Sequence, residues 1–318
     1  MSDPQITFAI PFLANLGYLM QAVASVCNQT VQSWELLVVD DASDESPRRW
    51  IDALGDQRIR YVRNHDRLGL AQNWNRCLQL ARAPLVTLLH ADDRFHPLYA
   101  QRVLAAAAEW PTTAAIATDA DVIGENGRPT RTLADWVKAR APRPDFDYEI
   151  TGDDGLAAIL RNNYLYSPTL CYRVALVGVS PFNQRWSMVT DLDLIARLLL
   201  DDQSIGVVNA PLYEYRRHRG STSAQLTRDT SRFNEELALY QLLAAQASEQ
   251  GWHLSATTAR HRWMIRCHLA VRCVQQVGTG RPRQARRLAT MLVTDVRRSA
   301  SAPQMVGSAS ASTRAPKT

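Results

Sequence analysis

Residues 85–97 read LVTLLHADDRFHP, and the fold can be worked out from this stretch. Its first five residues are apolar or β-branched, which predicts a strand buried on both faces of a sheet. The strand ends in His90-Ala-Asp-Asp93, at the position where open α/β sheets bind their ligands. Adjacent carboxylates repel unless a cation lies beside them, so one interpretation is an Mg²⁺ or Mn²⁺ site at Asp92. The alternative is that Asp92 and Asp93 only begin the next helix.

Strand patterns and helical patterns alternate on both sides of this stretch. We predict strands at residues 6–10, 34–39, 58–62 and 113–118, with helices between them in the sequence. This rhythm is typical of βαβ units, and therefore of an α/β fold with a mostly parallel sheet flanked by helices. After Asp121 the rhythm breaks. We expect a loop or hairpin excursion there, later followed by a helix over 191–200 and short strands over 205–209 and 212–216.

The C-terminal part has a different composition. Between residues 251 and 300 there are ten arginines and one acidic residue, Asp295. The pattern is helical from about residue 227 to about 298, and the remaining tail is of low complexity. We therefore predict a main domain at 1–224, an α-helical region at 225–299 and a disordered tail at 300–318.

Composition limits the class of protein. The chain has 318 residues, a formal net charge of +5 and 46% hydrophobic residues, as in globular proteins. We find no apolar run long enough for a transmembrane helix, and an acid, Asp3, stands where a signal peptide would be basic. We therefore expect a cytoplasmic protein with free cysteines, because no CxxC pair occurs. The basic helices favour peripheral contact with an anionic membrane, whereas no nucleic-acid-binding module is recognised.

Six motifs occur in one order along the chain. They are TFAIP at 7–11 with Asn15, WELLVVDDASD at 34–44, GLAQNWN at 69–75, LHADD at 89–93 with Pro97, TDLDL at 190–194 and YRRHRGS at 215–221. In this order they resemble the motifs of family 2 glycosyltransferases, over about residues 5–223. The resemblance implies a GT-A fold, which is Rossmann-like. It also implies inverting transfer of a sugar from a nucleotide diphospho-sugar, most often a UDP- or dTDP-sugar.

The resemblance also implies roles for single residues. Asp191 would be the catalytic base that takes the proton from the acceptor hydroxyl. A divalent metal, Mn²⁺ or Mg²⁺, would be held by Asp92 and His218 and would stabilise the charge on the departing nucleotide. The residues that would bind the nucleotide-sugar are Pro11, Asn15, Asp40, Asp41, Asn75, His90, Ala91, Asp92 and Arg216.

This chain departs from the family pattern at two positions. His90 stands where the family has Asp, and Thr190 stands where it has Glu. These departures motivate an alternative, a non-catalytic protein that binds nucleotide-sugars or serves as a scaffold. A nucleotidyltransferase is disfavoured because the Gly-rich phosphate loop after the first strand is missing.

The preferred reading is transfer to a saccharide or a lipid-linked glycan during surface polysaccharide assembly. It requires that Asp40, Asp92 and Asp191 converge around one cleft.

Overall fold

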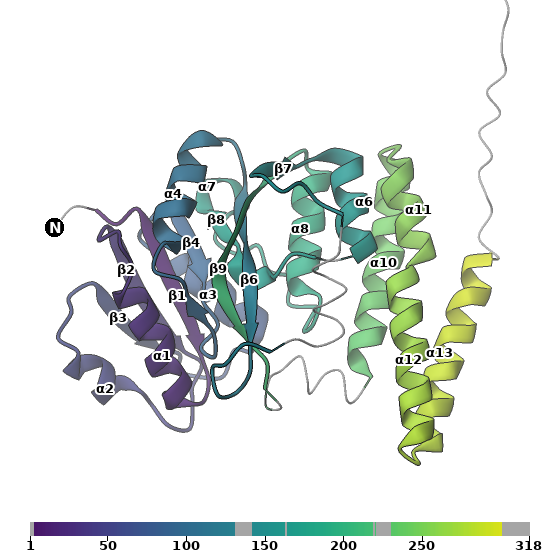
Figure 1. Cartoon of the computed structure of the whole chain (residues 1–318), viewed down its shortest axis with the longest axis horizontal. Helices are drawn as coiled ribbons and strands as arrows, with labels where there is room; N and C mark the ends of the chain where they lie inside the picture. The colour runs from purple at the N-terminus through teal and green to yellow at the C-terminus, as the bar shows by residue number, and fades with distance from the viewer. Residues whose placement is uncertain (1–2, 131–141, 163, 219, 221–229, 301–318) are drawn as a thin grey trace, which may run out of the picture. The chain divides into compact units, whose positions relative to one another are not determined.

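The computed structural model describes residues 3–130, 142–162, 164–218, 220 and 230–300 (Figure 1). The chain divides into two compact units, with the boundary between Ile265 and Arg266. The first unit contains the sheet and all helices up to α11, and the second contains most of α12 and all of α13. The sequence-based division after residue 224 stays a prediction.

The first unit is built on one mixed sheet, which has nine strands within the described residues. The strands are β1 (Ile6–Phe12), β2 (Trp34–Asp40), β3 (Ile59–Arg63), β4 (Leu85–Leu88), β5 (Arg94–Phe95), β6 (Ala115–Ile123), β7 (Tyr148–Ile150), β8 (Cys171–Arg173) and β9 (Ile205–Arg216). Their order is β3-β2-β1-β4-β8-β6-β9-β5, and β7 pairs with β9. The first four strands in this order are parallel, while β8 lies antiparallel between β4 and β6. The α/β class is confirmed, and the antiparallel β8 is what the strand–helix rhythm does not predict.

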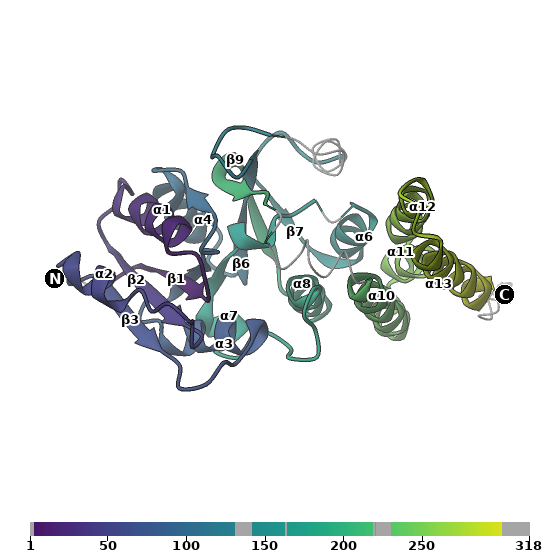
Figure 2. The same cartoon turned by 90° about the horizontal axis from the view of Figure 1, so that it is seen from below.

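The helices are α1 (Leu16–Cys27), α2 (Arg48–Ala53), α3 (Leu70–Leu80), α4 (Tyr99–Glu109), α6 (Gly152–Asn162), α7 (Val174–Val177), α8 (Thr190–Leu200), α10 (Ser231–Glu249), α11 (His253–His261), α12 (Trp263–Gly278) and α13 (Pro282–Ala300). Helices α1 and α4 cover one face of the sheet and α3 covers the other, as Figure 2 shows. None of the helices within the described ranges combines the length and apolar character needed to cross a membrane.

Burial explains why these segments form strands. Every residue of β2 is buried, as expected for a strand covered on both faces. The core on the α1–α4 face contains an aromatic group in which the ring centroids of Phe8 and Phe95 lie 5.0 Å apart and those of Phe95 and Tyr99 lie 4.1 Å apart. The five cysteines are free; Cys77 and Cys171 are buried, whereas Cys27 is exposed.

Strand β9 is continuous where the sequence predicts two short strands. Pro211 lies between the two predicted strands. Proline has no N–H to donate to a neighbouring strand, so it commonly interrupts strand pairing. In the structure Asp119 of β6 pairs with Pro211, and the register shifts on both sides of Asp119. This bulge absorbs the proline, so β6 and β9 continue together and β9 carries Tyr213 and Arg216 toward the end of β4.

Candidate active site

The turn after β4 places two acidic side chains in opposite environments. The Asp93 side chain is 1% exposed, and its carboxylate accepts hydrogen bonds from the Tyr213 hydroxyl at 2.8 Å and the Arg216 backbone N–H at 2.7 Å. The Asp92 side chain is 28% exposed. Strand β9 therefore holds Asp93 inward, and Asp92 is the acid of this pair that remains accessible.

Asp92 is paired with a histidine from the other end of the domain. His218 Nε2 lies 2.7 Å from Asp92 Oδ2, although the two residues are 126 positions apart. This hydrogen bond to the carboxylate raises the pKa of His218. Burial opposes ionisation of Asp92, but the His218 hydrogen bond and the nearby His90 outweigh it and lower the pKa of Asp92.

The pKa of Asp93 moves in the opposite direction. Burial raises it well above its usual range, and the neighbouring charge of Asp92 raises it further. The negative charge of the pair therefore lies mainly on Asp92.

The His90 imidazole is influenced by the charges of both Asp92 and Asp191, the base predicted from the sequence. Burial lowers the pKa of His90, and the negative charges of Asp92 and Asp191 both oppose this shift. Two carboxylates, one from the end of β4 and one from the first turn of α8, thus act on the same imidazole. The ring also lies against Trp74, with 5.5 Å between ring centroids.

The turn also offers a possible ligand set for a metal ion. One ligand atom each from His90, Asp92 and Asp93 lie within 4.8 Å of one another. A set of one imidazole nitrogen and two carboxylate oxygens suits Mn²⁺ and is compatible with Mg²⁺. Both Asp93 oxygens already accept hydrogen bonds, so Asp92 is the carboxylate better placed to bind an ion. An ion bound by both Asp92 and His218 would replace their hydrogen bond.

Asp40 and Asp41 lie at the same edge of the sheet but are fully engaged by the protein. Asp40 is 0% exposed and accepts bonds from Ser43 N–H, the Tyr61 hydroxyl and Arg63 Nη1. Asp41 is 4% exposed and accepts bonds from Asn64 Nδ2 and from the backbone N–H groups of Leu68 and Gly69. Asp40 is thus buried and saturated with hydrogen bonds, and the convergence of Asp40, Asp92 and Asp191 around one cleft stays a prediction.

Arg216, predicted to bind the nucleotide-sugar, is engaged by the protein itself. It is 2% exposed, and its guanidinium donates to Asp92 O at 2.6 Å and to Gln21 Oε1 at 2.9 Å. It also lies over the Tyr18 ring and donates to the carbonyls of Gly124 and Glu125. Burial and these bonds make Arg216 a support for the Asp92 backbone, and its predicted contact with the nucleotide-sugar stays a prediction.

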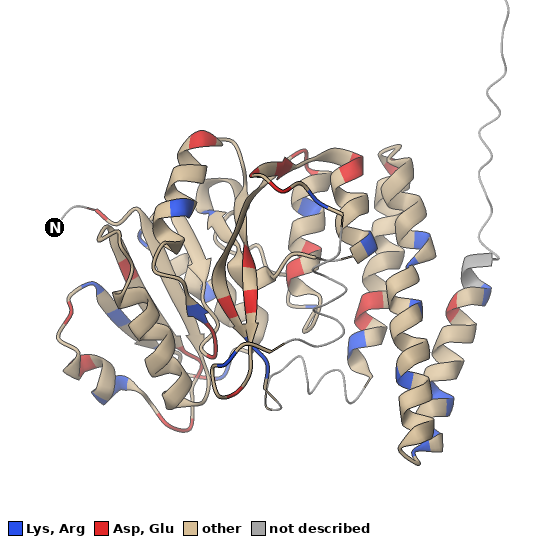
Figure 3. Ribbon diagram, in the orientation of Figure 1, with Lys and Arg blue, Asp and Glu red and all other residues tan. Residues whose placement is uncertain are grey.

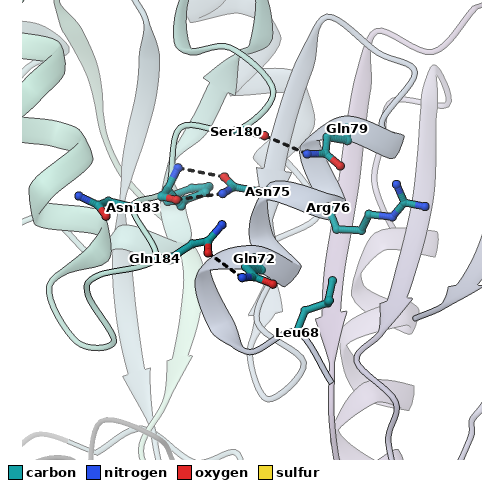
Figure 4. A pocket seen from close by; sticks show the side chains of 9 residues that line it. Leu68, Gln72, Asn75, Arg76, Gln79, Ser180, Asn183 and Gln184 are labelled. Carbon is teal, nitrogen blue, oxygen red and sulfur yellow. Dashed lines mark hydrogen bonds between the residues drawn. The ribbon is translucent and has the colours of Figure 1, made fainter. Parts of the chain in front are cut away.

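Asn75 joins α3 to the loop that precedes α8. Its amide donates to Phe182 O and accepts from Phe182 N–H, both at 2.9 Å. Gln72 and Gln79 on the same face of α3 bond to Gln184 and Ser180 of that loop. These side chains line an open polar hollow of about 540 Å³ (Figure 4). Asn75 therefore anchors the loop, and its predicted contact with the donor stays a prediction.

The remaining predicted residues lie at the start of the domain and in the turn. Asn15 caps α1, since its Oδ1 accepts from Tyr18 N–H at 3.0 Å. Pro11 is half-buried in β1 and Ala91 is half-buried in the turn. These positions are compatible with backbone or packing contacts to a donor, and their roles stay predictions.

Helix α10 contributes two acids that the sequence analysis missed. Glu235 Oε2 accepts from the N–H groups of Ser187 and Met188, in the loop before α8. Glu236 pairs with Arg232 at 2.7 Å, and its pKa is raised, first by burial and also by the charge of Asp191. No local motif marks these residues, because only the packing of α10 on α8 brings them near Asp191.

Comparisons with known proteins agree with this architecture. A family model described as glycosyl transferase family 2 matches residues 7–165. The putative glycosyltransferase EpsH of Bacillus subtilis is 24% identical over 260 residues, which is 78% of this chain and 71% of EpsH. A glucosyltransferase of Escherichia coli, WfgD, is 30% identical over 93 residues, which is 29% of this chain and 37% of WfgD. The matches cover only 23–35% of the length of the first three curated relatives.

Solved structures show a similar fold. The crystal structure of S. aureus TarS 1-349 in complex with UDP-GlcNAc superposes with a TM-score of 0.58 at 18% sequence identity. The superposition covers 77% of this chain and 66% of the TarS chain.

Proposed function

Because the chain belongs to glycosyl transferase family 2, we propose that it transfers a sugar from a nucleotide diphospho-sugar to an acceptor hydroxyl with inversion at the anomeric carbon. One observation carries the proposal: the partly exposed Asp92, after β4, is hydrogen-bonded at 2.7 Å to His218, 126 residues later, so two of the six motifs meet at one point. The effect of the Asp191 charge on the pKa of His90 supports a place for Asp191 near the same turn. A displacement reaction requires the groups that bind the leaving group and the base for the acceptor to act at one site.

In the proposed reaction, Asp191 accepts the proton of the acceptor hydroxyl. The hydroxyl oxygen then bonds to the anomeric carbon, and the bond between that carbon and the phosphate oxygen breaks. The nucleoside diphosphate leaves with the electron pair of this bond. A divalent metal, when bound, would supply electrostatic stabilisation of this leaving group. Asp92 would hold it, with His90 or His218 as nitrogen ligands.

The names of similar proteins support the finer parts of the proposal. WfgD is named as a transferase that uses UDP-Glc and a diphosphoundecaprenol-linked acceptor, and one TarS structure contains UDP-GlcNAc. For this chain we propose a UDP- or dTDP-sugar donor and a saccharide or lipid-linked glycan acceptor in surface polysaccharide assembly. A lipid-linked acceptor would place the protein in the cytoplasm, at the inner face of the membrane.

Two measurements test this function. A thermal-shift panel of UDP-, dTDP-, GDP- and CMP-sugars, with and without Mn²⁺, should show stabilisation by one nucleotide class, because ligands that bind the native state raise its melting temperature. With that donor, Asp191→Asn should slow transfer by about 10²–10⁴-fold and leave donor binding intact. The matched control is Asp201→Asn, which changes an exposed acid just beyond the C-terminal end of α8.

The alternative remains a non-catalytic binding protein. Donor binding without transfer or hydrolysis by the wild type, across a panel of acceptors, would favour it. Absence of any nucleotide-sugar binding would contradict both functions.

A further inference from the structure

The second unit contains a helical hairpin with an uneven surface. Helices α12 and α13 run antiparallel, because Arg266 near the start of α12 pairs with Asp295 near the end of α13 at 2.8 Å. Closer to the turn, Cys273 Sγ lies 3.4 Å from Ala285 O. The end of the hairpin near the turn therefore consists of the last turns of α12 and the first turns of α13.

The last turns of α12 expose apolar side chains. Val271, Val274 and Val277 are 47%, 72% and 64% exposed, whereas Leu269 and Gln276 are buried at 0% and 7%. A helix turns by about 100° per residue, so the three valines share one face about 120° wide. Three exposed valines on one helix face form an apolar strip that can serve as a contact surface.

The first turns of α13 add positive charge at the same end of the hairpin as these valines. Arg281, Arg283, Arg286 and Arg287 are exposed, and none forms an ion pair with another described residue. The only acidic residue between 251 and 300, Asp295, is 3% exposed and is already paired with Arg266. Figure 3 shows the resulting group of basic residues on this hairpin. We call this surface the valine–arginine patch, defined by Val271, Val274, Val277, Arg281, Arg283, Arg286 and Arg287.

We propose that the valine–arginine patch docks on the surface of a bilayer that contains anionic lipid. The valines would enter the boundary between headgroups and acyl chains, and the arginines would bind lipid phosphates at the same depth. Neither feature alone selects a membrane, but apolar side chains flanked by unpaired cations match its interface. Single-stranded nucleic acid is disfavoured, because the patch offers no aromatic ring for a base to stack on.

A second copy of the chain is also a poor occupant of the patch. A two-fold symmetric contact would bring two sets of four arginines together without an acidic partner in the described part of the patch. Docking extends the proposed function, since it names the surface that would hold the protein at the membrane, but it does not require glycosyl transfer. The docking and the proposed activity can therefore fail separately.

Flotation of the full-length protein with lipid vesicles tests the proposal. The wild type should bind vesicles of phosphatidylcholine with about 30% phosphatidylglycerol and should not bind pure phosphatidylcholine. Raising the salt concentration from about 0.1 M to about 0.5 M should release most of the protein, because screening weakens the contacts of the arginines. This salt test needs no variant, so it holds even where a substitution disturbs folding.

Variants then separate the two halves of the patch from general charge. The quadruple change of Arg281, Arg283, Arg286 and Arg287 to Gln should weaken binding at least about tenfold, since each basic residue near an anionic surface adds about fivefold. Val274→Ser with Val277→Ser should weaken binding several-fold and leave its salt dependence in place. The matched control changes four exposed arginines of the first unit to Gln and removes the same total charge: Arg48, Arg49, Arg102 and Arg161.

Three outcomes would overturn the proposal. They are equal binding to neutral vesicles, no binding to anionic vesicles, and an equal loss in the control variant. Formation of dimers that the quadruple variant abolishes, in the absence of lipid binding, would instead assign the patch to a second copy.

Discussion

Asp40-Asp41 follows strand β2 and Asp92-Asp93 follows strand β4, and these two strands flank β1 on opposite sides. Both pairs lie at the carboxyl edge of parallel strands. In the first pair both side chains are at most 4% exposed and accept two or more hydrogen bonds from the protein. In the second pair only Asp93 is consumed in this way, while Asp92 remains 28% exposed beside His218.

The difference teaches that position in the sheet does not by itself make an acid available for chemistry. A carboxylate that is saturated by N–H and O–H donors stabilises the loop that supplies the donors. A carboxylate with one partner and some exposure keeps lone pairs for a metal or a substrate. The first pair therefore stabilises the edge of the sheet, and the second pair leaves one acid, Asp92, partly exposed.

The largest expected effect is on activity at the second pair. Asp92→Asn should reduce transfer by about 10²–10³-fold, because it removes the charge that would hold a metal at the leaving group. The midpoint of chemical denaturation should change little, since Asp92 is partly exposed. Activity of this variant near the wild-type level would contradict the assignment, and Asp44→Asn, at a 99% exposed acid, is the control.

The matching change at the first pair should act on stability. Asp41→Asn should lower the free energy of unfolding by about 2–4 kcal/mol. The new amide NH₂ is a donor, and it would face N–H groups from which the carboxylate now accepts hydrogen bonds. Urea denaturation measures this loss, with Asp44→Asn expected within about 0.5 kcal/mol of wild type. If Asp41→Asn were as stable as wild type but had lost donor binding, the contrast between the pairs would be wrong.

Asn75 tests the same distinction between a structural and a ligand-binding side chain. The sequence predicts that it contacts the sugar donor, whereas in the structure its amide is hydrogen-bonded to the backbone of Phe182. Asn75→Ala should lower the free energy of unfolding by about 1–2 kcal/mol through the loss of two buried hydrogen bonds. KM for the donor should stay unchanged if the role is structural. Gln72→Ala removes one exposed bond from the same helix face and serves as the control.

The smallest effect is a shift in titration at the second pair. In the metal-free protein, the pKa of His218 should lie above its ordinary value of 6.5, and Asp92→Asn should bring it down. Titration of the imidazole by NMR measures both values. An unchanged pKa in the variant would show that the hydrogen bond to Asp92 does not cause the shift.

The sign of the pH dependence follows from these shifts. Because folding raises the pKa of His218, its contribution to stability is fully present below pH 6.5 and is lost as pH rises through the folded value. Folding lowers the pKa of Asp92, so its contribution is present above pH 3.8 and is lost as pH falls through its folded value. Denaturation curves at several pH values should show the pair stabilising the protein most in mildly acid solution.

The sequence by itself determined the α/β class, the positions of β1 to β4 and the order of the motifs. It could do so because apolar runs of strand length and helical spacing are local properties of the chain. Through the family resemblance it also named Asp92 and His218, which the structure shows to be hydrogen-bonded to each other, while the role of Asp191 stays a prediction. Comparison with the family motifs also shows that His90 and Thr190 replace the Asp and Glu of the family pattern.

Only the tertiary structure decided which polar groups are already used. Arg216 and Asn75 look available in the sequence, but their hydrogen-bond partners lie more than 90 residues away. Glu236 is another case, since it is paired locally with Arg232 but its pKa is also raised by the charge of Asp191, on a different helix. Hydrogen-bond satisfaction and burial depend on residues that are distant along the chain, so no local pattern can report them. For that reason the sequence predicted the acids, and the fold decided which of them are buried and already hydrogen-bonded.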